Sequence, residues 1–311
     1  MASSSARYQN TGPVDCSTPV DASSLSGKTA IVTGGSNGIG ATYTHALVNA
    51  GVTVFIGDLD QNGADKLSKQ YPGQVYHLLF LVDTNQAALF KSAIAKSPSG
   101  NIDIVVVNAG ISGQDPVFLN PSAAEGGEPE EPDLKILNVN LIGATYTVKL
   151  ALHYFEAQAA RDPSSVTSLV LQGSLAGYVN QPGTPQYNAS KYGLRGMLGS
   201  LRQTSLIHGT RVNYIAPWYI KTDIISDAAL ERITSKGVLL AEIGDAGEAL
   251  LRIVSNQSIH GRAIAIVPRI WAPRGHLDVN HDDYPEDDFI HEWQHLVLKT
   301  SHRLVGASLI P

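Results

Sequence analysis

The chain has 311 residues, of which 43% are hydrophobic and 16% charged; this excludes wholesale disorder and leaves room for a sizeable buried core. No apolar run is long enough to span a membrane, and a net charge of −6 without a basic stripe excludes an obvious nucleic-acid surface, so we expect neither partner. The single cysteine, Cys16, cannot form an internal disulfide, and the first residues lack the apolar core of a secretory signal, so a cytoplasmic protein is expected.

The predicted elements follow a regular order. Residues 1–25 are rich in Ser, Thr, Pro and Asp and predict a polar, poorly ordered leader. Short β-branched runs then alternate with amphipathic stretches, and several runs are apolar on both faces, as in a parallel sheet covered by helices. Strands are predicted at 29–33, 52–57, 75–80, 102–107, 168–172, 211–216 and 263–267. Helices are predicted near 39–50, 62–70, 84–96, 133–158, 186–208 and 245–255. The alternation predicts an α/β fold with a doubly wound parallel sheet of about seven strands in a single domain, 26–270.

Two stretches interrupt this pattern. Residues 112–132 contain four prolines and predict an exposed loop, and residues 271–311 form a C-terminal extension. The extension contains His291-Glu-Trp-Gln-His295, the spacing of a zinc protease helix. No Asp or Glu follows Glu292 as a third ligand, so the segment favours a terminal amphipathic helix with its apolar side chains packed on the body, and we expect no metal site. These apolar side chains are Trp293, Leu296 and Val297.

A glycine-rich turn links the first predicted strand to the first helix. A turn of this kind lets the backbone approach a pyrophosphate at the helix N-terminus, and it predicts a dinucleotide site formed by Gly34, Ser36, Asn37, Gly38, Ile39 and Gly40. The second strand ends at Asp58, whose carboxylate can bind the adenosine ribose hydroxyls of NAD and repel the additional phosphate of NADP. The next residue is Leu59 and no basic residue follows, so the predicted cofactor is NAD.

Later motifs carry a family resemblance. Asn108-Ala109-Gly110, Asn140, Ser174 and Tyr187-Asn-Ala-Ser-Lys191, together with the glycine-rich turn, resemble the short-chain dehydrogenase/reductase family over about 26–270. The resemblance implies a Rossmann-type fold, hydride transfer at a secondary alcohol or ketone, and a homodimer or homotetramer. The chain resembles fungal secondary-metabolite members such as the 5′-hydroxyaverantin dehydrogenases and, more distantly, the 15-hydroxyprostaglandin dehydrogenases. The resemblance implies a catalytic set of Asn140, Ser174, Tyr187 and Lys191, and further cofactor contacts from Leu59, Asp83, Asn108, Ala109, Gly110, Tyr187, Lys191, Pro217 and Thr222.

The residues themselves also suggest the chemistry. Tyr187 and Lys191 are four apart on a predicted helix and share a face, so the ammonium is expected to lower the pKa of the tyrosine from about 10. The tyrosine would then remove a proton from an alcohol, while Ser174 holds the substrate oxygen. By the resemblance, Asn140 anchors a water that links Lys191 to solvent.

The substrate pocket departs from the family pattern. The family usually has Pro-Gly after the sixth strand, whereas this chain has Pro217-Trp218. The indole either walls the substrate site or packs under a lid, predicted at 223–241, whose isoleucines and leucines favour an apolar ligand. The predicted pocket residues are Leu175, Tyr178, Val179 and Trp218. The alternatives are an NAD(P)H-dependent ketoreductase or imine reductase, a catalytically silent NAD-binding protein and a zinc hydrolase.

Overall fold

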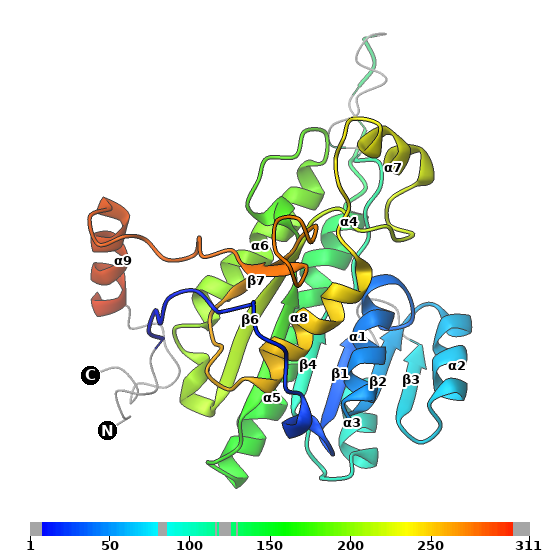
Figure 1. Cartoon of the computed structure of the whole chain (residues 1–311), viewed down its shortest axis with the longest axis vertical. Coiled ribbons are helices and arrows are strands. Elements are labelled where there is room, and N and C mark those ends of the chain that lie inside the picture. Colours follow the sequence, from blue (N-terminus) through cyan, green and yellow to red (C-terminus); the bar gives the residue numbers. More distant parts are fainter. Residues whose placement is uncertain (1–7, 80–85, 116, 118–125, 129, 301–311) are drawn as a thin grey trace.

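The computed structural model describes residues 8–79, 86–115, 117, 126–128 and 130–300. Its centre is an eight-stranded sheet in the order β3-β2-β1-β4-β5-β6-β7-β8 (Figure 1). The first seven strands are parallel, and β8 runs antiparallel to β7. The strands are β1 (Thr29–Thr33), β2 (Thr53–Asp58), β3 (Val75–Leu79), β4 (Ile104–Val107), β5 (Thr167–Gln172), β6 (Thr210–Pro217), β7 (Ala263–Ile266) and β8 (His276–Asp278).

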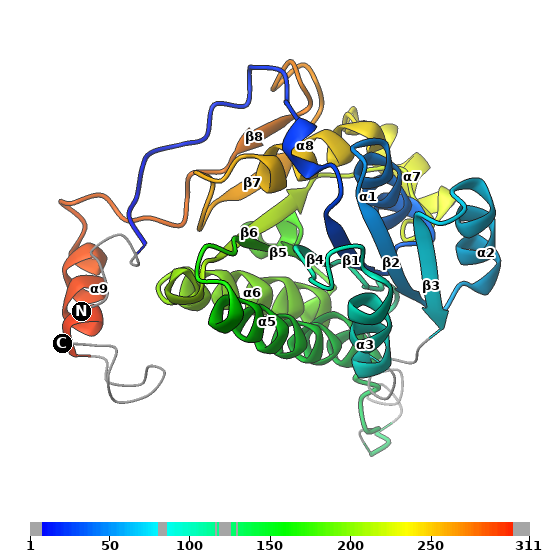
Figure 2. The same ribbon diagram turned by 90° about the horizontal axis from the view of Figure 1, so that it is seen from below.

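Two layers of helices cover the sheet (Figure 2). Helices α1 (Gly38–Asn49) and α8 (Ile243–Ser255) pack on one face, and α3 (Gln86–Lys96), α5 (Ala144–Arg161) and α6 (Pro185–Leu201) pack on the other. Helix α2 (Gln61–Gln70) lies beside β3 at the edge of the sheet. Every residue of β1, β4 and β5 is buried, because both faces of these strands are covered. The predicted doubly wound α/β fold is confirmed.

The seven predicted strands are found with their ends shifted by at most two residues. The eighth strand, β8, was not predicted, because three residues in an edge strand give no readable alternation of apolar and polar side chains. The order of strands reverses between β1 and β4: β2 and β3 follow on one side of β1, and β4 to β8 follow on the other. The chain therefore leaves the carboxyl ends of β1 and β4 in opposite directions, which opens a crevice between them. In open α/β sheets ligands bind at this reversal point.

The two terminal segments meet at the β8 edge of the sheet. Arg252 of α8 donates hydrogen bonds to the carbonyl oxygens of Asp15, Cys16 and Thr18, which fixes the N-terminal segment against the body. The Asp278 carboxylate of β8 accepts hydrogen bonds from the Val14 amide and the Arg262 guanidinium. Residues 8–25 and 276–278 therefore belong to one packed region.

Helix α9 (Phe289–Thr300) projects away from the body (Figures 1 and 2). Its apolar side chains are exposed, with relative accessibilities of 62% for Trp293, 49% for Leu296 and 57% for Val297. The prediction that they pack on the body is wrong, because the segment that follows β8 leads the helix outwards. Among the described residues, no group of three His, Cys, Asp or Glu side chains lies close enough to hold a metal ion. None of the described helices has the length and apolar character needed to cross a membrane.

Candidate active site

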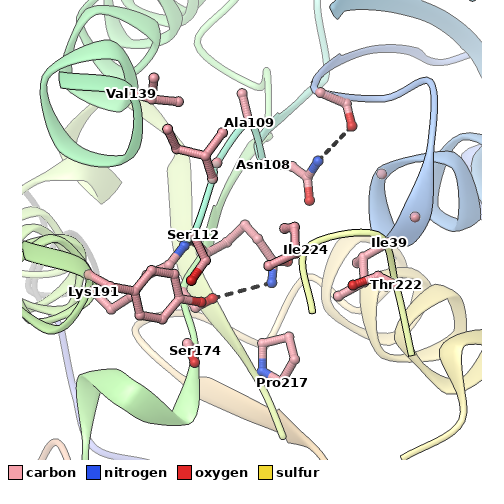
Figure 3. A pocket seen from close by; sticks show the side chains of 18 of the residues that line it. Ile39, Asn108, Ala109, Ser112, Val139, Ser174, Lys191, Pro217, Thr222 and Ile224 are labelled. Carbon is pink, nitrogen blue, oxygen red and sulfur yellow. Dashed lines mark hydrogen bonds between the residues drawn. The ribbon is translucent and has the colours of Figure 1, made fainter. Parts of the chain in front are cut away.

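A cavity of about 1180 Å³ lies along the carboxyl ends of the central strands (Figure 3). Its lining includes residues at or just after the ends of β1, β2, β4, β5 and β6, which places it at the reversal point of the sheet. Ordinary small-ligand pockets measure about 300–1,000 Å³. The cavity therefore has room for an extended ligand together with a second, smaller one.

The glycine-rich turn between β1 and α1 has the shape that a phosphate cradle requires. Gly34 and Gly38 have φ values of +64° and +52°, and a Cβ atom on Gly40 would overlap the carbonyl oxygen of Gly34. Asn37 makes no side-chain cap, so the first N–H groups of α1 remain available at the cavity. The Ser36 hydroxyl is buried with no hydrogen-bond partner among the described atoms. The free N–H groups of α1 fit a pyrophosphate.

Asp58 ends β2 at the wall of the same cavity. One carboxylate oxygen accepts a hydrogen bond from the Ser36 amide at 2.8 Å, and the other accepts from the Leu59 and Asp60 amides at 2.7 and 3.0 Å. Three backbone donors therefore fix the position of the charge. Leu59 lies beside it with 63% exposure and also lines the cavity, so this part of the lining is acidic and apolar.

Ser174, Tyr187 and Lys191 line the cavity, although they come from two separate elements. Figure 3 shows Ser174 and Lys191. Ser174 is the second residue after β5, and Tyr187 and Lys191 lie one turn apart on α6. The Lys191 Nζ atom lies 5.5 Å from the centroid of the Tyr187 ring and donates to the carbonyl oxygen of Gln172 at 3.1 Å. The arrangement brings a hydroxyl, a phenol and an ammonium together.

Burial controls the ionisation of this group. It raises the pKa of Tyr187 above its usual value, and the hydrogen bond with Ser174 opposes that rise. It also lowers the pKa of Lys191 to about 8. The expectation that Lys191 lowers the pKa of Tyr187 is therefore not met in the structure, because both groups lose solvent and the ammonium hydrogen-bonds to a carbonyl oxygen instead.

Asn140 lies behind the cavity wall and is 1% exposed. It belongs to a π-helical turn, η4 (Asn138–Gly143), between the short helix α4 (Lys135–Leu137) and α5. Its side chain accepts from the Ile111 amide at 2.8 Å and donates to the Ile111 carbonyl at 2.9 Å and the Ser190 hydroxyl at 3.3 Å. Asn140 therefore ties the loop after β4 to the helix that carries Tyr187.

Most of the other predicted cofactor residues line the cavity. Asn108 donates to the carbonyl oxygens of Thr33 and Gly34, which joins the end of β4 to the glycine-rich turn (Figure 3). Further described lining residues are Gly34, Asn37, Gly38, Ile39, Gly40, Ala109, Gly110, Pro217 and Thr222. Ser36 is not among the described lining residues. Asp83, also a predicted contact, lies outside the described residues.

The predicted substrate residues divide into two groups. Leu175, Val179 and Trp218 line the cavity. Tyr178 is not among the described lining residues, because the short 3-10 turn η5 (Leu175–Gly177) directs its ring elsewhere. The Tyr178 hydroxyl instead donates to Asp282 of the C-terminal extension at 2.5 Å.

Trp218 both walls the cavity and contacts the predicted lid, which are the two alternatives that the sequence left open. It lines the cavity, and its indole N–H donates to the carbonyl oxygen of Leu239 at 2.9 Å, near the end of the predicted lid. Its ring packs edge-on against Tyr219 and Trp271, with centroid distances of 5.0 and 5.4 Å. The C-terminal extension therefore supports this wall of the cavity through Trp271.

Two residues near the site were missed by sequence reasoning. Ser112 lines the same cavity as Ser174 and Lys191 (Figure 3). It follows Gly110 by two residues, and this position next to the predicted cofactor motif could have indicated it. Asp115 falls in a segment predicted to be an exposed loop, but it is 2% exposed. Its carboxylate accepts from the Gln186 amide at 2.6 Å at the N-terminus of α6, where a negative charge is favourable. No pattern in the sequence indicates this contact.

Known proteins resemble this chain over most of its length. The family model described as short chain dehydrogenase matches residues 28–232. The chain is 31% identical over 283 residues to the 5′-hydroxyaverantin dehydrogenase of Dothistroma septosporum, which covers 85% of this chain and 90% of that protein. It is 34% identical over 278 residues to the NADP-dependent dehydrogenase M3 of a Phoma species, which covers 83% of this chain and 80% of that protein.

A solved structure supports the fold. The 3-ketoacyl-(acyl-carrier-protein) reductase from Brucella melitensis, complexed with NADH, superposes with a TM-score of 0.66. The match covers 78% of this chain and 97% of that one at 24% identity.

Proposed function

Because the chain belongs to the short-chain dehydrogenase family, and is thus an oxidoreductase acting on alcohol or ketone groups, we propose that it uses NAD and acts on a secondary carbon of an apolar substrate. The observation that carries the proposal is the meeting of Ser174, Tyr187 and Lys191 in the cavity that the glycine-rich turn and Asp58 also line. A hydride donor and a proton donor can then act on the same carbon–oxygen bond.

Tyr187 exchanges the proton with the substrate oxygen. It takes this proton from an alcohol during oxidation and returns it to a ketone during reduction. Ser174 holds the same oxygen by a hydrogen bond, and its hydrogen bond with Tyr187 favours the phenolate against the effect of burial. The chemistry that bound NAD supplies is acceptance of the hydride from the alcohol carbon, and NADH supplies the reverse. Asn140 has a positioning role here, since it holds the loop after β4 against α6.

Asp58 supports NAD over NADP. Its carboxylate is fixed by three amide groups and suits two ribose hydroxyls, whereas a phosphate on that ribose would face a fixed negative charge. The Phoma relative is named as NADP-dependent, so the preference of this chain depends on its own residues. We therefore infer NAD from Asp58 and Leu59 rather than from the relatives.

The lining supports an apolar substrate with a ring system. Leu175, Val179, Trp218, Ile224 and Ile225 contribute apolar surface to the cavity. Residues 223–241 are proposed as the lid over it. The name of the Dothistroma relative adds support for a fungal secondary metabolite. An NAD(P)H-dependent ketoreductase or imine reductase is the alternative reaction, and a silent NAD-binding protein is the alternative without catalysis.

We also propose that the active form is a homodimer or homotetramer. Ile142, Tyr146 and Tyr192 are 46%, 48% and 40% exposed on η4, α5 and α6, and contact with a second copy of the chain would remove their apolar surface from water. Sedimentation or light scattering of the purified protein measures the assembly, and a monomer at all concentrations would contradict it.

The decisive experiment compares the wild type with Tyr187→Phe. Cyclohexanol, 1-phenylethanol and 1-tetralol are offered with NAD, and the matching ketones and a cyclic imine with NADH, while absorbance of the reduced nicotinamide is followed. We expect turnover of the bicyclic alcohol to fall by about 100-fold or more in Tyr187→Phe, while NADH affinity stays near that of the wild type. Tyr76→Phe, a change on the distant strand β3, is the control.

The outcomes separate the candidate functions. NADH binding without turnover of any compound indicates the silent protein, and turnover of the imine alone indicates an imine reductase. Normal turnover by Tyr187→Phe would show that another group transfers the proton.

A further inference from the structure

Tyr214 joins the two elements that carry the proposed catalytic side chains. It lies on β6 and is fully buried. Its hydroxyl accepts a hydrogen bond from the Ser174 amide at 3.2 Å and can donate to the carbonyl oxygen of Lys191 at 3.2 Å or of Ser174 at 3.3 Å. One phenol oxygen therefore contacts the backbone of the loop after β5 and the backbone of α6.

The loop around Ser174 is shaped by the Tyr214 ring. A Cβ atom on Gly173 would overlap that ring, and one on Gly177 would lie 2.5 Å from its hydroxyl oxygen. Glycine is therefore needed on both sides of Ser174, because the ring occupies the space. Within the loop, the Ser174 hydroxyl accepts a hydrogen bond from the Ala176 amide at 3.0 Å, which leaves its proton for another oxygen.

The C-terminal extension supports the far side of Tyr214. The Tyr178 ring packs edge-on against the Tyr214 ring at 6.1 Å, and its hydroxyl donates to Asp282 at 2.5 Å. Arg195, one turn after Lys191 on α6, lies 4.0 Å above the Tyr178 ring and donates to Asp282 at 2.7 Å and to the Gly177 carbonyl at 3.2 Å. A continuous set of contacts thus runs from residue 282 to the backbone of Ser174.

Resting on the proposed function, we propose that Tyr214 is a positioning residue that fixes Ser174 relative to the helix of Tyr187, and that the C-terminal extension braces it through Asp282. A misplacement of a catalytic donor by a fraction of an ångström weakens a hydrogen bond in the transition state. Burial raises the pKa of Tyr214, which keeps its hydroxyl protonated and able to donate a hydrogen bond.

A double-mutant cycle tests whether Tyr214 acts through Ser174. The variants are Tyr214→Phe, Ser174→Ala and their combination, assayed for reduction of 1-tetralone with NADH. Tyr214→Phe removes only the bridging oxygen, and we expect kcat to fall about 10-fold with the KM for NADH within about twofold of the wild type. In the Ser174→Ala background the same change should have almost no further effect, because the group it positions is absent.

The cycle distinguishes positioning from general damage. An additive loss in the double variant, or a kcat for Tyr214→Phe equal to that of the Tyr76→Phe control, overturns the inference. Asp282→Ala tests the brace, and we expect a smaller fall in kcat that is not additive with Tyr214→Phe. An additive Asp282→Ala effect would refute the role assigned to the extension.

An activity-independent measurement separates this inference from the proposed function. Amide hydrogen exchange of the peptide that covers 173–178 should be faster in Tyr214→Phe than in the wild type, since the Ser174 amide loses its acceptor. Unchanged protection would overturn the inference even if the enzyme is active. If exchange is faster in Tyr214→Phe but the wild type reduces no ketone, the link through Tyr214 is supported and the proposed function is rejected.

Discussion

The cofactor preference can be reversed by a double substitution, Asp58→Ala with Leu59→Arg. The Asp58 carboxylate cannot turn away from a phosphate without losing its hydrogen bonds to three amides, at 2.7–3.0 Å. Leu59 is 63% exposed, so an arginine at this position can reach the ligand without disturbing the core. Arginine binds phosphate through two parallel hydrogen bonds.

The size of the preference follows from Coulomb's law. Two unit charges about 4 Å apart repel by about 1 kcal/mol in bulk water and about 4 kcal/mol at an effective dielectric of about 20. Asp58 is half-buried and lies between these limits. We therefore expect the wild type to bind NADH about 5- to 1,000-fold more tightly than NADPH. The double variant should shift this ratio by at least about 10-fold toward NADPH, because it removes the repulsion and adds a partner.

Fluorescence titration of both reduced cofactors measures the two affinities without any substrate. Asp65→Ala is the matched control, since it removes a carboxylate from the neighbouring helix α2 outside the cavity lining. Leu59→Arg alone keeps the carboxylate and its hydrogen bonds to the turn, and should change the ratio less. Tighter binding of NADPH by the wild type, or an unmoved ratio in the folded double variant, would refute the reasoning.

Three further predictions concern pH, the cavity wall and stability. Alcohol oxidation should speed up and ketone reduction should slow down as pH rises, because oxidation needs the phenolate of Tyr187, whose pKa is raised by burial, and reduction needs its phenol. Initial rates in both directions measure this, and flat pH profiles under rate-limiting hydride transfer would contradict it. Trp271→Ala should raise the KM for 1-tetralone by about threefold and leave NADH affinity unchanged, since it removes the ring that packs against Trp218 of the cavity wall. An equal effect of Trp293→Ala, a change on the projecting helix α9, would argue against this. Asp278→Ala should lower the free energy of unfolding by about 3 kcal/mol, because it removes the carboxylate that pairs through two hydrogen bonds with the guanidinium of Arg262, a residue that is 4% exposed. Denaturant unfolding measures this, and a loss below about 1 kcal/mol would mean that the pair contributes no more than a surface salt bridge.

The local sequence alone determined the order and type of the main elements. Apolar runs such as 104–107 predicted strands covered on both faces, and the glycine spacing predicted the turn between β1 and α1. The four-residue spacing of Tyr187 and Lys191 predicted that they share a helix face. These features are readable because backbone periodicity and glycine conformations act over a few residues.

Only the tertiary structure decided what surrounds those residues. Asp115 reaches the N-terminus of α6 across 71 positions, and Tyr178 turns away from the cavity to meet Asp282 across 104 positions. Trp218 and Tyr214 acquire their neighbours from the C-terminal extension and from the loop after β5. No short-range pattern encodes such pairs, because they depend on which elements the sheet places side by side. Burial likewise reversed the expected direction of the pKa of Tyr187, since desolvation is a property of the packed site rather than of the spacing between two side chains.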